Sequence, residues 1–320
     1  MVHASGALSF NSRRSPNFSQ RGMVSCSQPL AAVAGVRILQ AGGNAADAAV
    51  AVAACLNVTE PCSTGIGGDA FCLYFDAATH EVSAMNGSGR SPAALSLAVL
   101  EAKGLADRAD PAFPATHAHN VTVPGAAAAW CDAVAKFGSG KLSMAEVLAP
   151  GIALAEDGHP VSFTTAWHWQ NAEKLLQTQP GGEQLLQPGG AAPKAGELFK
   201  NPNLGKTFRA LAENGKAGFY GADSDIAAAI VAGVKAGLGG DERGAIERSD
   251  LERHTTDFDA PISVMYKGVE VWEHPPNGQG ITALIALNIL EGAYPAGLCA
   301  DCWHPDAYLL LLWHWCPCLC

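Results

Sequence analysis

The chain has 320 residues, of which 48% are apolar and 16% charged, a composition typical of a soluble globular protein with a sizeable core. Its formal net charge of −10 disfavours a nucleic-acid-binding surface, which needs clustered lysine and arginine. Residues 1–21 form a polar lead-in without a continuous apolar run. We therefore expect no signal peptide, no membrane span and a cytoplasmic location.

Two helices are predicted within the first sixty residues. The first starts at Pro29, because proline is tolerated in a first helical turn, and ends before Gly42. The second follows Asn44, a favourable N-cap, and carries Asp47 in its first turn, where a carboxylate favours the helix dipole. Its alanine- and valine-rich sequence is apolar on all sides, which predicts burial, and residues 59–61 end it.

Alternating apolar residues further along predict two hairpins and one short strand, over residues 70–75 with 82–85, 261–266 with 269–273, and 121–123. Helical periodicity predicts helices over residues 126–137, 144–156, 224–236 and 280–291, and helical pieces joined by loops between 171 and 200. Because helices and hairpins alternate irregularly, an α+β fold is favoured over a doubly wound parallel sheet.

A glycine-rich loop, GIGGDA at residues 65–70, joins the second helix to the first predicted strand. It fits the loose pattern of dinucleotide-binding loops, but those loops follow a strand and open a helix. The order here is reversed, which removes the helix N-terminus that would hold a pyrophosphate. The loop is therefore predicted to be a tight helix-to-strand turn, and no nucleotide cofactor is expected.

Other chemistry-bearing residues are scattered. Arg90 lies on a second glycine-rich loop, NGSGRSP, where it could bind a carboxylate in a bidentate fork or be a solvated surface residue. His117 and His119 lack further ligands at metal-site spacing, so no metal is expected. The threonine pairs at 164–165 and 255–256 would need a nearby base or a free α-amine to act as nucleophiles, and strand propensity explains the second pair.

The cysteines fall into two groups. Five lie between residues 26 and 131 and are interpreted as small core residues, as Cys55 illustrates inside its apolar run. Five more lie between residues 299 and 320, where Cys299-x-x-Cys302 with nearby histidines could bind zinc. Because the composition changes abruptly after Tyr294, we favour a frameshift or an alternative 3′ end for this tail, taken as residues 293–320.

Several motifs occur together in one frame: PLA, GGNAADAAVA, EP and SxGIGG, then NGSGRSPAAL, VTVPGAAAAW, LAPGIALAEDGHPVS and YKGVEVWEHPPNGQGITALIALNILEG. Over residues 22–292 the chain therefore resembles the large-subunit region of the γ-glutamyltranspeptidases, or glutathione hydrolases. The resemblance implies an N-terminal-nucleophile hydrolase with a four-layer αββα sandwich. The precursor of such an enzyme cuts itself into a large and a small subunit. The cut exposes a threonine whose α-amine is its own general base.

The resemblance also implies substrates and site residues. Glutathione or other γ-glutamyl amides are the expected substrates, with no cofactor and with the small subunit as partner. Arg90 would contact the substrate carboxylate. The pocket wall would be shaped by Gly65, Gly67, Gly68 and Asp69.

Two departures from the family pattern keep alternatives open. The family's nucleophilic threonine lies downstream of the matched region in a Thr-Thr-His-like segment, and neither threonine pair here has that context, so no catalytic residue is assigned. We expect a truncated large subunit that is inactive alone, and a non-catalytic fragment or partner of a complete paralogue is the alternative. The family's arginine lies four residues before Pro92, where this chain has Ser88, which leaves room for an acylase with a non-glutamyl substrate.

Overall fold

The computed structural model describes residues 15–106, 117–236 and 243–293. They form two compact units, the first from residues 15–74 and 85–257 and the second from residues 75–84 and 258–293. Helices and antiparallel strand pairs make up both, which confirms the predicted α+β class. The tail lies outside the described residues from 294 onward, so its interpretations stay predictions. None of the described helices combines the length and the apolar character needed to cross a membrane.

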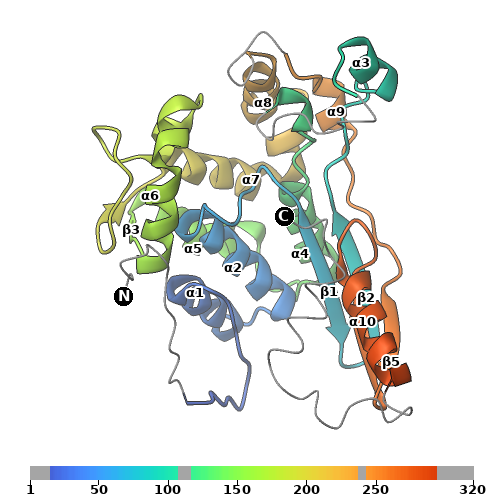
Figure 1. Ribbon diagram of the computed structural model, residues 1–320. Helices are drawn as coiled ribbons and strands as arrows, with labels where there is room; N and C mark the ends of the chain where they lie inside the picture. Colours follow the sequence, from blue (N-terminus) through green and yellow to red (C-terminus); the bar gives the residue numbers. More distant parts are fainter. Residues whose placement is uncertain (1–14, 107–116, 237–242, 294–320) are drawn as a thin grey trace. The chain divides into compact units, whose positions relative to one another are not determined.

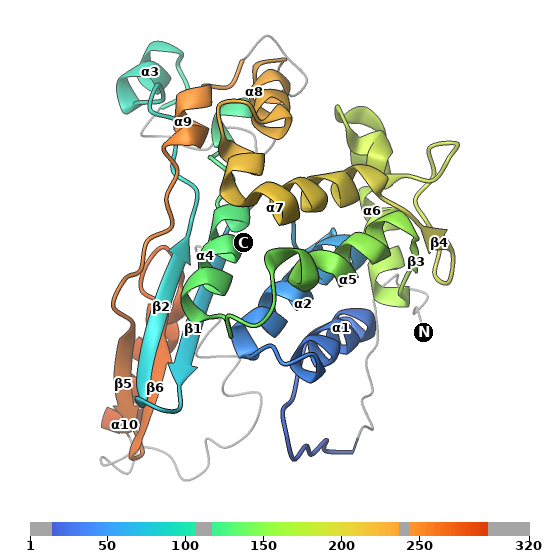
Figure 2. The same cartoon turned by 180° about the vertical axis from the view of Figure 1, so that it is seen from behind.

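The core of the first unit is built around helix α2, Ala45–Thr59. Figure 1 shows α2 beside α1, Pro29–Gln40, and it also packs on α4, Ala126–Phe137, and α5, Met144–Glu156. Seen from behind in Figure 2, α5 lies along α7, Pro202–Tyr220. The predicted burial of α2 is confirmed. Its small side chains let neighbouring helices approach closely.

The start of α2 is fixed by a capping box. The Asn44 side chain accepts hydrogen bonds from the backbone N–H groups of residues 46 and 47, and Asp47 Oδ2 accepts from the Asn44 N–H at 3.0 Å. The same Asp47 oxygen accepts from the Ser139 N–H at 3.0 Å. Asp47 is fully buried, so this carboxylate ties the start of α2 to the loop that follows α4.

Further helices, two 3₁₀ turns and one short strand pair complete the first unit outside its hairpin. They are α3 Leu97–Ala102, the 3₁₀ turns η1 Ala118–Asn120 and η2 Gly182–Leu185, β3 His159–Pro160 paired with β4 Leu198–Phe199, α6 Phe163–Thr178, α8 Asp225–Ala236 and α9 Arg248–Glu252. Thr165 of the first threonine pair is completely buried in α6, where its hydroxyl accepts a hydrogen bond from Gln28 Nε2 at 3.1 Å. This contact gives Thr165 a structural role.

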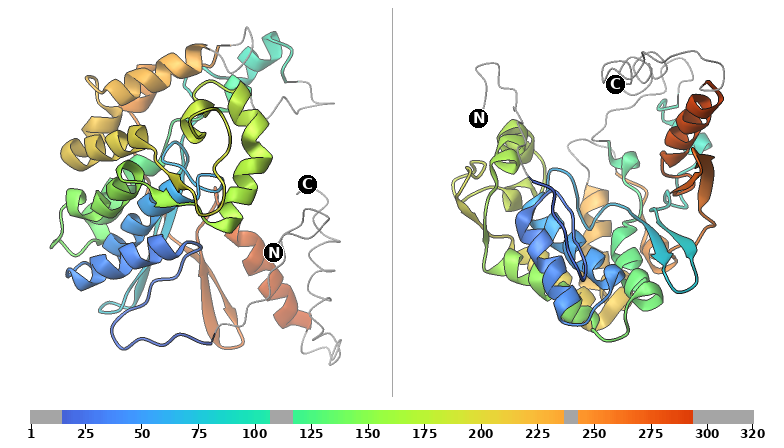
Figure 3. Two further views of the ribbon diagram at one scale, coloured as in Figure 1. Left: turned by 90° about the vertical axis from the view of Figure 1, so that its left-hand side faces the viewer. Right: turned by 90° about the horizontal axis from the view of Figure 1, so that it is seen from below.

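Two hairpins match their predicted positions. The first pairs β1, Ala70–Asp76, with β2, Glu81–Gly87. The second pairs β5, Ile262–Tyr266, with β6, Val269–Glu273, through a turn at Lys267 and Gly268 whose φ angles are 49° and 79°. Two successive positive φ angles suit the right-handed twist of a two-residue hairpin. Helix α10, Gly280–Ala293, packs on this second hairpin, as both views of Figure 3 show.

The short strand predicted over residues 121–123 was wrong. Residues 121–123 are extended but belong to no strand, because the Val123 N–H donates a single hydrogen bond to the Arg90 carbonyl instead of joining a ladder. Thr255 and Thr256 are likewise outside any strand. At Val123 the backbone pairs with a distant loop, which strand propensity does not reveal.

Candidate functional site

Three glycines allow the end of β2 and the loop after it to cross the segment that leads into α4 at very short distance. A Cβ on Gly89 would lie 1.7 Å from the Val123 carbonyl oxygen, and one on Gly125 would lie 2.0 Å from the Gly87 carbonyl oxygen. A Cβ on Gly87 would lie 2.4 Å from that of Ala129. No side chain fits at these positions, so we call Gly87, Gly89 and Gly125 the glycine crossing.

Hydrogen bonds lock the crossing. The Gly68 carbonyl accepts from the N–H groups of Gly125 and Ala126, both at 2.9 Å. Asp69 Oδ1 accepts from the Gly89 N–H at 2.8 Å. The glycine-rich loop before β1 and the loop that carries Arg90 are therefore held together as one unit.

In the loop before β1, by contrast, two glycines have room for a side chain. Nothing lies within 4 Å of a Cβ placed on Gly65 or Gly67, and neither residue has a positive φ angle. Buried Ile66 anchors the loop, while Gly65, Gly67, Gly68 and Asp69 are exposed. We call residues 65–68 the open glycine loop. Nothing in the described part of the chain requires glycine at positions 65 and 67, so their exposed backbone is accessible to another group.

This loop follows helix α2 and precedes strand β1, which confirms the predicted order. Its turn is closed by a hydrogen bond from the Gly68 N–H to the Gly65 carbonyl at 3.0 Å. The geometry is that of a tight turn between a helix and a strand, as predicted.

Arg90 is engaged by the chain itself. Its Nη2 donates to Asp257 Oδ2 at 2.7 Å, and its Nη1 lies 3.3 Å from Thr255 Oγ1. Asp257 is held in turn by reciprocal backbone hydrogen bonds with Asn86, and the segment after α9 runs beside the segment after β2 in Figures 1 and 2. The Arg90 side chain is 57% exposed. One edge of the guanidinium is thus neutralised by an internal carboxylate.

Tyr220 and His254 support the crossing from one side. The Tyr220 hydroxyl donates to the Pro124 carbonyl at 2.6 Å and accepts from the Ala128 N–H at 3.0 Å. The His254 ring stacks on Tyr220 with ring centroids 5.4 Å apart. Burial lowers the pKa of His254, and the nearby positive charge of Arg90 lowers it further, so the neutral imidazole is favoured.

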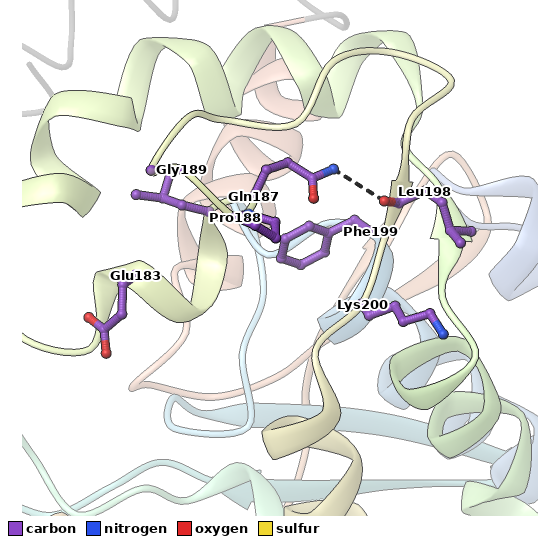
Figure 4. Close-up of a pocket in the computed structure, with 9 residues that line it drawn as sticks. Glu183, Gln187, Pro188, Gly189, Leu198, Phe199 and Lys200 are labelled. Atoms are coloured by element: carbon purple, nitrogen blue, oxygen red, sulfur yellow. Dashed lines mark hydrogen bonds between the residues drawn. The ribbon is translucent and has the colours of Figure 1, made fainter.

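The described part of the first unit contains a larger and a smaller cavity. The larger, about 570 Å³, lies between η2 and β4 and is shown in Figure 4, where Gln187 Nε2 donates to the Leu198 carbonyl at 3.1 Å. Its charged residues, Glu183 and Lys200, stand on opposite sides of the lining. The smaller cavity, about 140 Å³, is lined by Arg90 and its neighbours. Neither lining includes Gly65, Gly67, Gly68 or Asp69.

The described ranges show neither a group of metal ligands nor, at Cys55 and Cys131, a reactive thiol. They contain no group of three or more histidine, cysteine or acidic side chains able to hold a metal ion. His117 instead caps η1, its Nδ1 accepting from the His119 N–H at 3.1 Å. Burial raises the pKa of Cys55 to about 12 and that of Cys131 to about 11, which keeps both thiols protonated and unreactive.

Sequence reasoning singled out Arg90 and the open glycine loop but missed their partners. Asp257 and Thr255 lie more than 160 residues after Arg90 in the chain, and no local pattern marks the contact. The position of His254 beside Tyr220 was missed for the same reason.

The family model of gamma-glutamyltranspeptidase matches residues 31–303. The chain belongs to the γ-glutamyltranspeptidase family. It is 39% identical to the glutathione hydrolase-like YwrD proenzyme of Bacillus subtilis strain 168 over 263 residues, which cover 82% of this chain and 47% of that protein. The chain spans about half the length of the curated relatives it matches.

Solved structures show the same fold. The crystal structure of cephalosporin acylase from Bacillus halodurans superimposes with a TM-score of 0.76 at 36% identity, covering 94% of this chain and 55% of that chain. The γ-glutamyltranspeptidase of Helicobacter pylori gives a TM-score of 0.77 at 25% identity, covering 87% of this chain and 77% of that chain. The predicted N-terminal-nucleophile hydrolase fold is thereby confirmed.

Proposed function

We propose that this chain is the large-subunit part of an amide hydrolase or acyltransferase that acts on γ-glutamyl amides such as glutathione. The observation that carries the proposal is the pairing of two loops. The crossing fixes the Arg90 loop against the open glycine loop, in which nothing in the described chain requires glycine at positions 65 and 67. Membership of the family supplies the reaction class. A cytoplasmic location is part of the same proposal.

The described residues would bind and position the substrate. The exposed edge of the Arg90 guanidinium would contact a substrate carboxylate. Gly65, Gly67 and Gly68 would admit the amide close to the backbone, and Asp69 would hold the Arg90 loop through the Gly89 N–H. The nucleophile would be a threonine with a free α-amine in the other half of the family's length. It would attack the γ-glutamyl carbonyl, and the acyl group would then pass to water or to an acceptor amine.

The test joins this chain to the downstream half of the Bacillus subtilis relative and measures self-cleavage and release of aniline from a γ-glutamyl anilide. We expect the joined protein to cleave itself and to hydrolyse the anilide, and this chain alone to do neither. A joined protein that cleaves itself but hydrolyses no amide would overturn the proposal. It would favour the non-catalytic alternative.

A second candidate is an acylase for a non-glutamyl amide, and the Arg90–Asp257 ion pair favours it. The carboxylate of Asp257 already occupies the Nη2 edge that a substrate carboxylate would use, and Ser88 stands at the family's arginine position. One protein of known structure that is 36% identical to this chain is a cephalosporin acylase.

Three anilides separate the two candidates. A γ-glutamyl anilide carries both an α-amine and a carboxylate, a glutaryl anilide carries only the carboxylate, and a butyryl anilide carries neither. The acylase reading predicts that butyryl anilide is hydrolysed at least as well as γ-glutamyl anilide. Asp257→Asn should free Arg90 and raise kcat/KM for the carboxylate-bearing anilides, whereas Asp223→Asn, at an exposed residue, is the matched control.

A further inference from the structure

The larger cavity of the first unit, between η2 and β4, has the size of a small-molecule binding site. Its volume of about 570 Å³ falls within the range of typical ligand pockets. Its apolar side chains are Leu186, Pro188, Leu198 and Phe199. It shares no lining residue with the smaller cavity beside Arg90. We call it the η2–β4 pocket.

Hydrogen bonds hold the loop after η2 in place along this pocket. Gln187 Nε2 donates to the Leu198 carbonyl at 3.1 Å, which ties the loop to β4 (Figure 4). The Gln187 N–H donates to the Ala191 carbonyl at 2.8 Å, and from α6 Trp169 Nε1 donates to the Leu185 carbonyl at 2.7 Å. Because the lining is already ordered, a ligand loses little free energy in fixing it.

The pocket offers both a fixed apolar wall and an exposed apolar side chain. Phe199 is buried and contacts Trp169 edge to face, with ring centroids 4.7 Å apart. Leu198, next to it in β4, is 56% exposed. An apolar ligand group that covers Leu198 removes this surface from water, which favours binding.

Two opposite charges stand on opposite sides of the lining, Glu183 on η2 and Lys200 after β4 (Figure 4). Both residues are exposed. Neither side chain makes an ion pair or a hydrogen bond with another described residue. The ammonium group of Lys200 offers three donors, and the Glu183 carboxylate offers two acceptor oxygens. A ligand with a positive charge at one end and a negative charge at the other therefore complements both.

The lining also has room and hydrogen-bonding capacity for an amide. The Gln187 side chain donates through its nitrogen, and its oxygen has no hydrogen-bond partner among the described residues. Gly189 and Gly190 have open space around them, since nothing lies within 4 Å of a Cβ placed on either. Their backbone is therefore accessible to a peptide group.

We propose that the η2–β4 pocket binds a linear di- or tripeptide that carries an apolar side chain. The terminal ammonium group contacts Glu183, the terminal carboxylate contacts Lys200, and the apolar side chain covers Leu198. A single α-amino acid does not fit this arrangement, because both its charges lie next to one carbon atom, whereas two or three extended residues span about 7–11 Å. This inference goes beyond the proposed function, because the peptide is bound and no bond is cleaved.

The test is isothermal titration calorimetry of the full chain with the peptide Gly-Leu-Gly. Three altered peptides are compared with it, namely the N-acetylated form, the C-terminal amide and Gly-Gly-Gly. We expect saturable binding of Gly-Leu-Gly and an affinity lower by about threefold or more for each altered peptide, because each loses one ionic contact or the apolar contact.

Variants of the two charged residues assign the contacts. Lys200→Gln should bind Gly-Leu-Gly and its amide equally, and Glu183→Gln should bind Gly-Leu-Gly and its acetylated form equally. Lys174→Gln, at an exposed lysine of α6 outside the lining, should bind like the wild type. Unfolding curves establish that the variants are folded. The proposal fails if Gly-Leu-Gly gives no saturable binding, if an altered peptide binds the wild type as tightly as Gly-Leu-Gly does, or if folded Lys200→Gln or Glu183→Gln binds Gly-Leu-Gly as tightly as the wild type.

Discussion

The glycine crossing and the open glycine loop use the same residue type for different reasons. At Gly87, Gly89 and Gly125 the missing side chain is required by the chain's own packing, since a Cβ would overlap a carbonyl oxygen or another Cβ. At Gly65 and Gly67 a Cβ would meet nothing. The two regions are joined through Gly68 and Asp69, yet substitution should affect folding in the first and function in the second.

The comparison separates glycines that the fold requires from glycines that it does not require. A glycine that a fold needs shows short distances to backbone atoms of its own chain. Where a glycine is exposed, has open space around it and has an ordinary φ angle, the described residues do not explain why it is glycine. We therefore propose that glycine at positions 65 and 67 leaves room for a substrate or for the remaining part of the enzyme.

The largest effect is expected for Gly89→Ala. The new Cβ would lie 1.7 Å from the Val123 carbonyl oxygen, so the backbone of one segment must move and its hydrogen bonds must change. We expect a loss of at least about 3 kcal/mol in the free energy of unfolding, measured in urea. A loss below about 1 kcal/mol would mean that the crossing relaxes easily.

The second-largest effect is expected for Tyr220→Phe, which should lower the free energy of unfolding by about 2 kcal/mol. The substitution leaves the buried Pro124 carbonyl and the Ala128 N–H without their hydrogen-bond partner. Tyr74→Phe is the matched control. Tyr74 stacks on Phe137 with ring centroids 4.8 Å apart, and the phenyl ring keeps that contact. Equal destabilisation of the two variants, compared in the same urea experiment, would show that the hydroxyl of Tyr220 does not support the crossing.

Acid should lower the stability of the first unit. Burial lowers the pKa of both His159 and His254 in the folded state. As the pH falls through the ordinary histidine value of about 6.5, the unfolded chain takes up protons first, and stability present above that pH is lost towards the lower folded values. The free energy of unfolding should therefore be lower at pH 5.5 than at pH 7.5.

His254→Phe should reduce this pH dependence, because the folded chain then has one fewer histidine that resists protonation. Unfolding in urea at the two pH values measures it. If the free energy of unfolding differs between the two pH values as much in the variant as in the wild type, His254 does not contribute to the pH dependence.

The smallest effect on stability is expected for Gly67→Ala. No neighbour lies within 4 Å of the added methyl group and the φ angle is compatible with alanine, so the free energy of unfolding should change by no more than about 0.5 kcal/mol. A large destabilisation would remove the distinction between the two glycine regions.

Much of the fold was predictable because its signals are local. Asn44 and Asp47 mark the start of α2, and Lys267-Gly268 marks the turn of the second hairpin. Helix α7 was not predicted although Asn201 caps it and Leu204, Phe208 and Leu211 repeat at helical spacing. Its glycines, including Gly215 with a positive φ angle, interrupt the pattern.

The candidate site was predictable only in part. Arg90 and the glycines stand out in the sequence because of their residue types. Their partners Asp257 and Thr255 do not, since the contact depends on how distant loops meet. The open space around Gly67 is likewise a property of the fold. From sequence alone, a glycine needed for packing and one left open look the same.

The most direct test of the account measures kcat/KM for anilide hydrolysis by the joined protein carrying Gly67→Ala. Its unfolding is compared in parallel with that of the wild type. The account predicts unchanged stability with kcat/KM reduced about tenfold or more, because the methyl group occupies space that the substrate or the second half of the enzyme approaches. Unchanged stability with unchanged kcat/KM would contradict it.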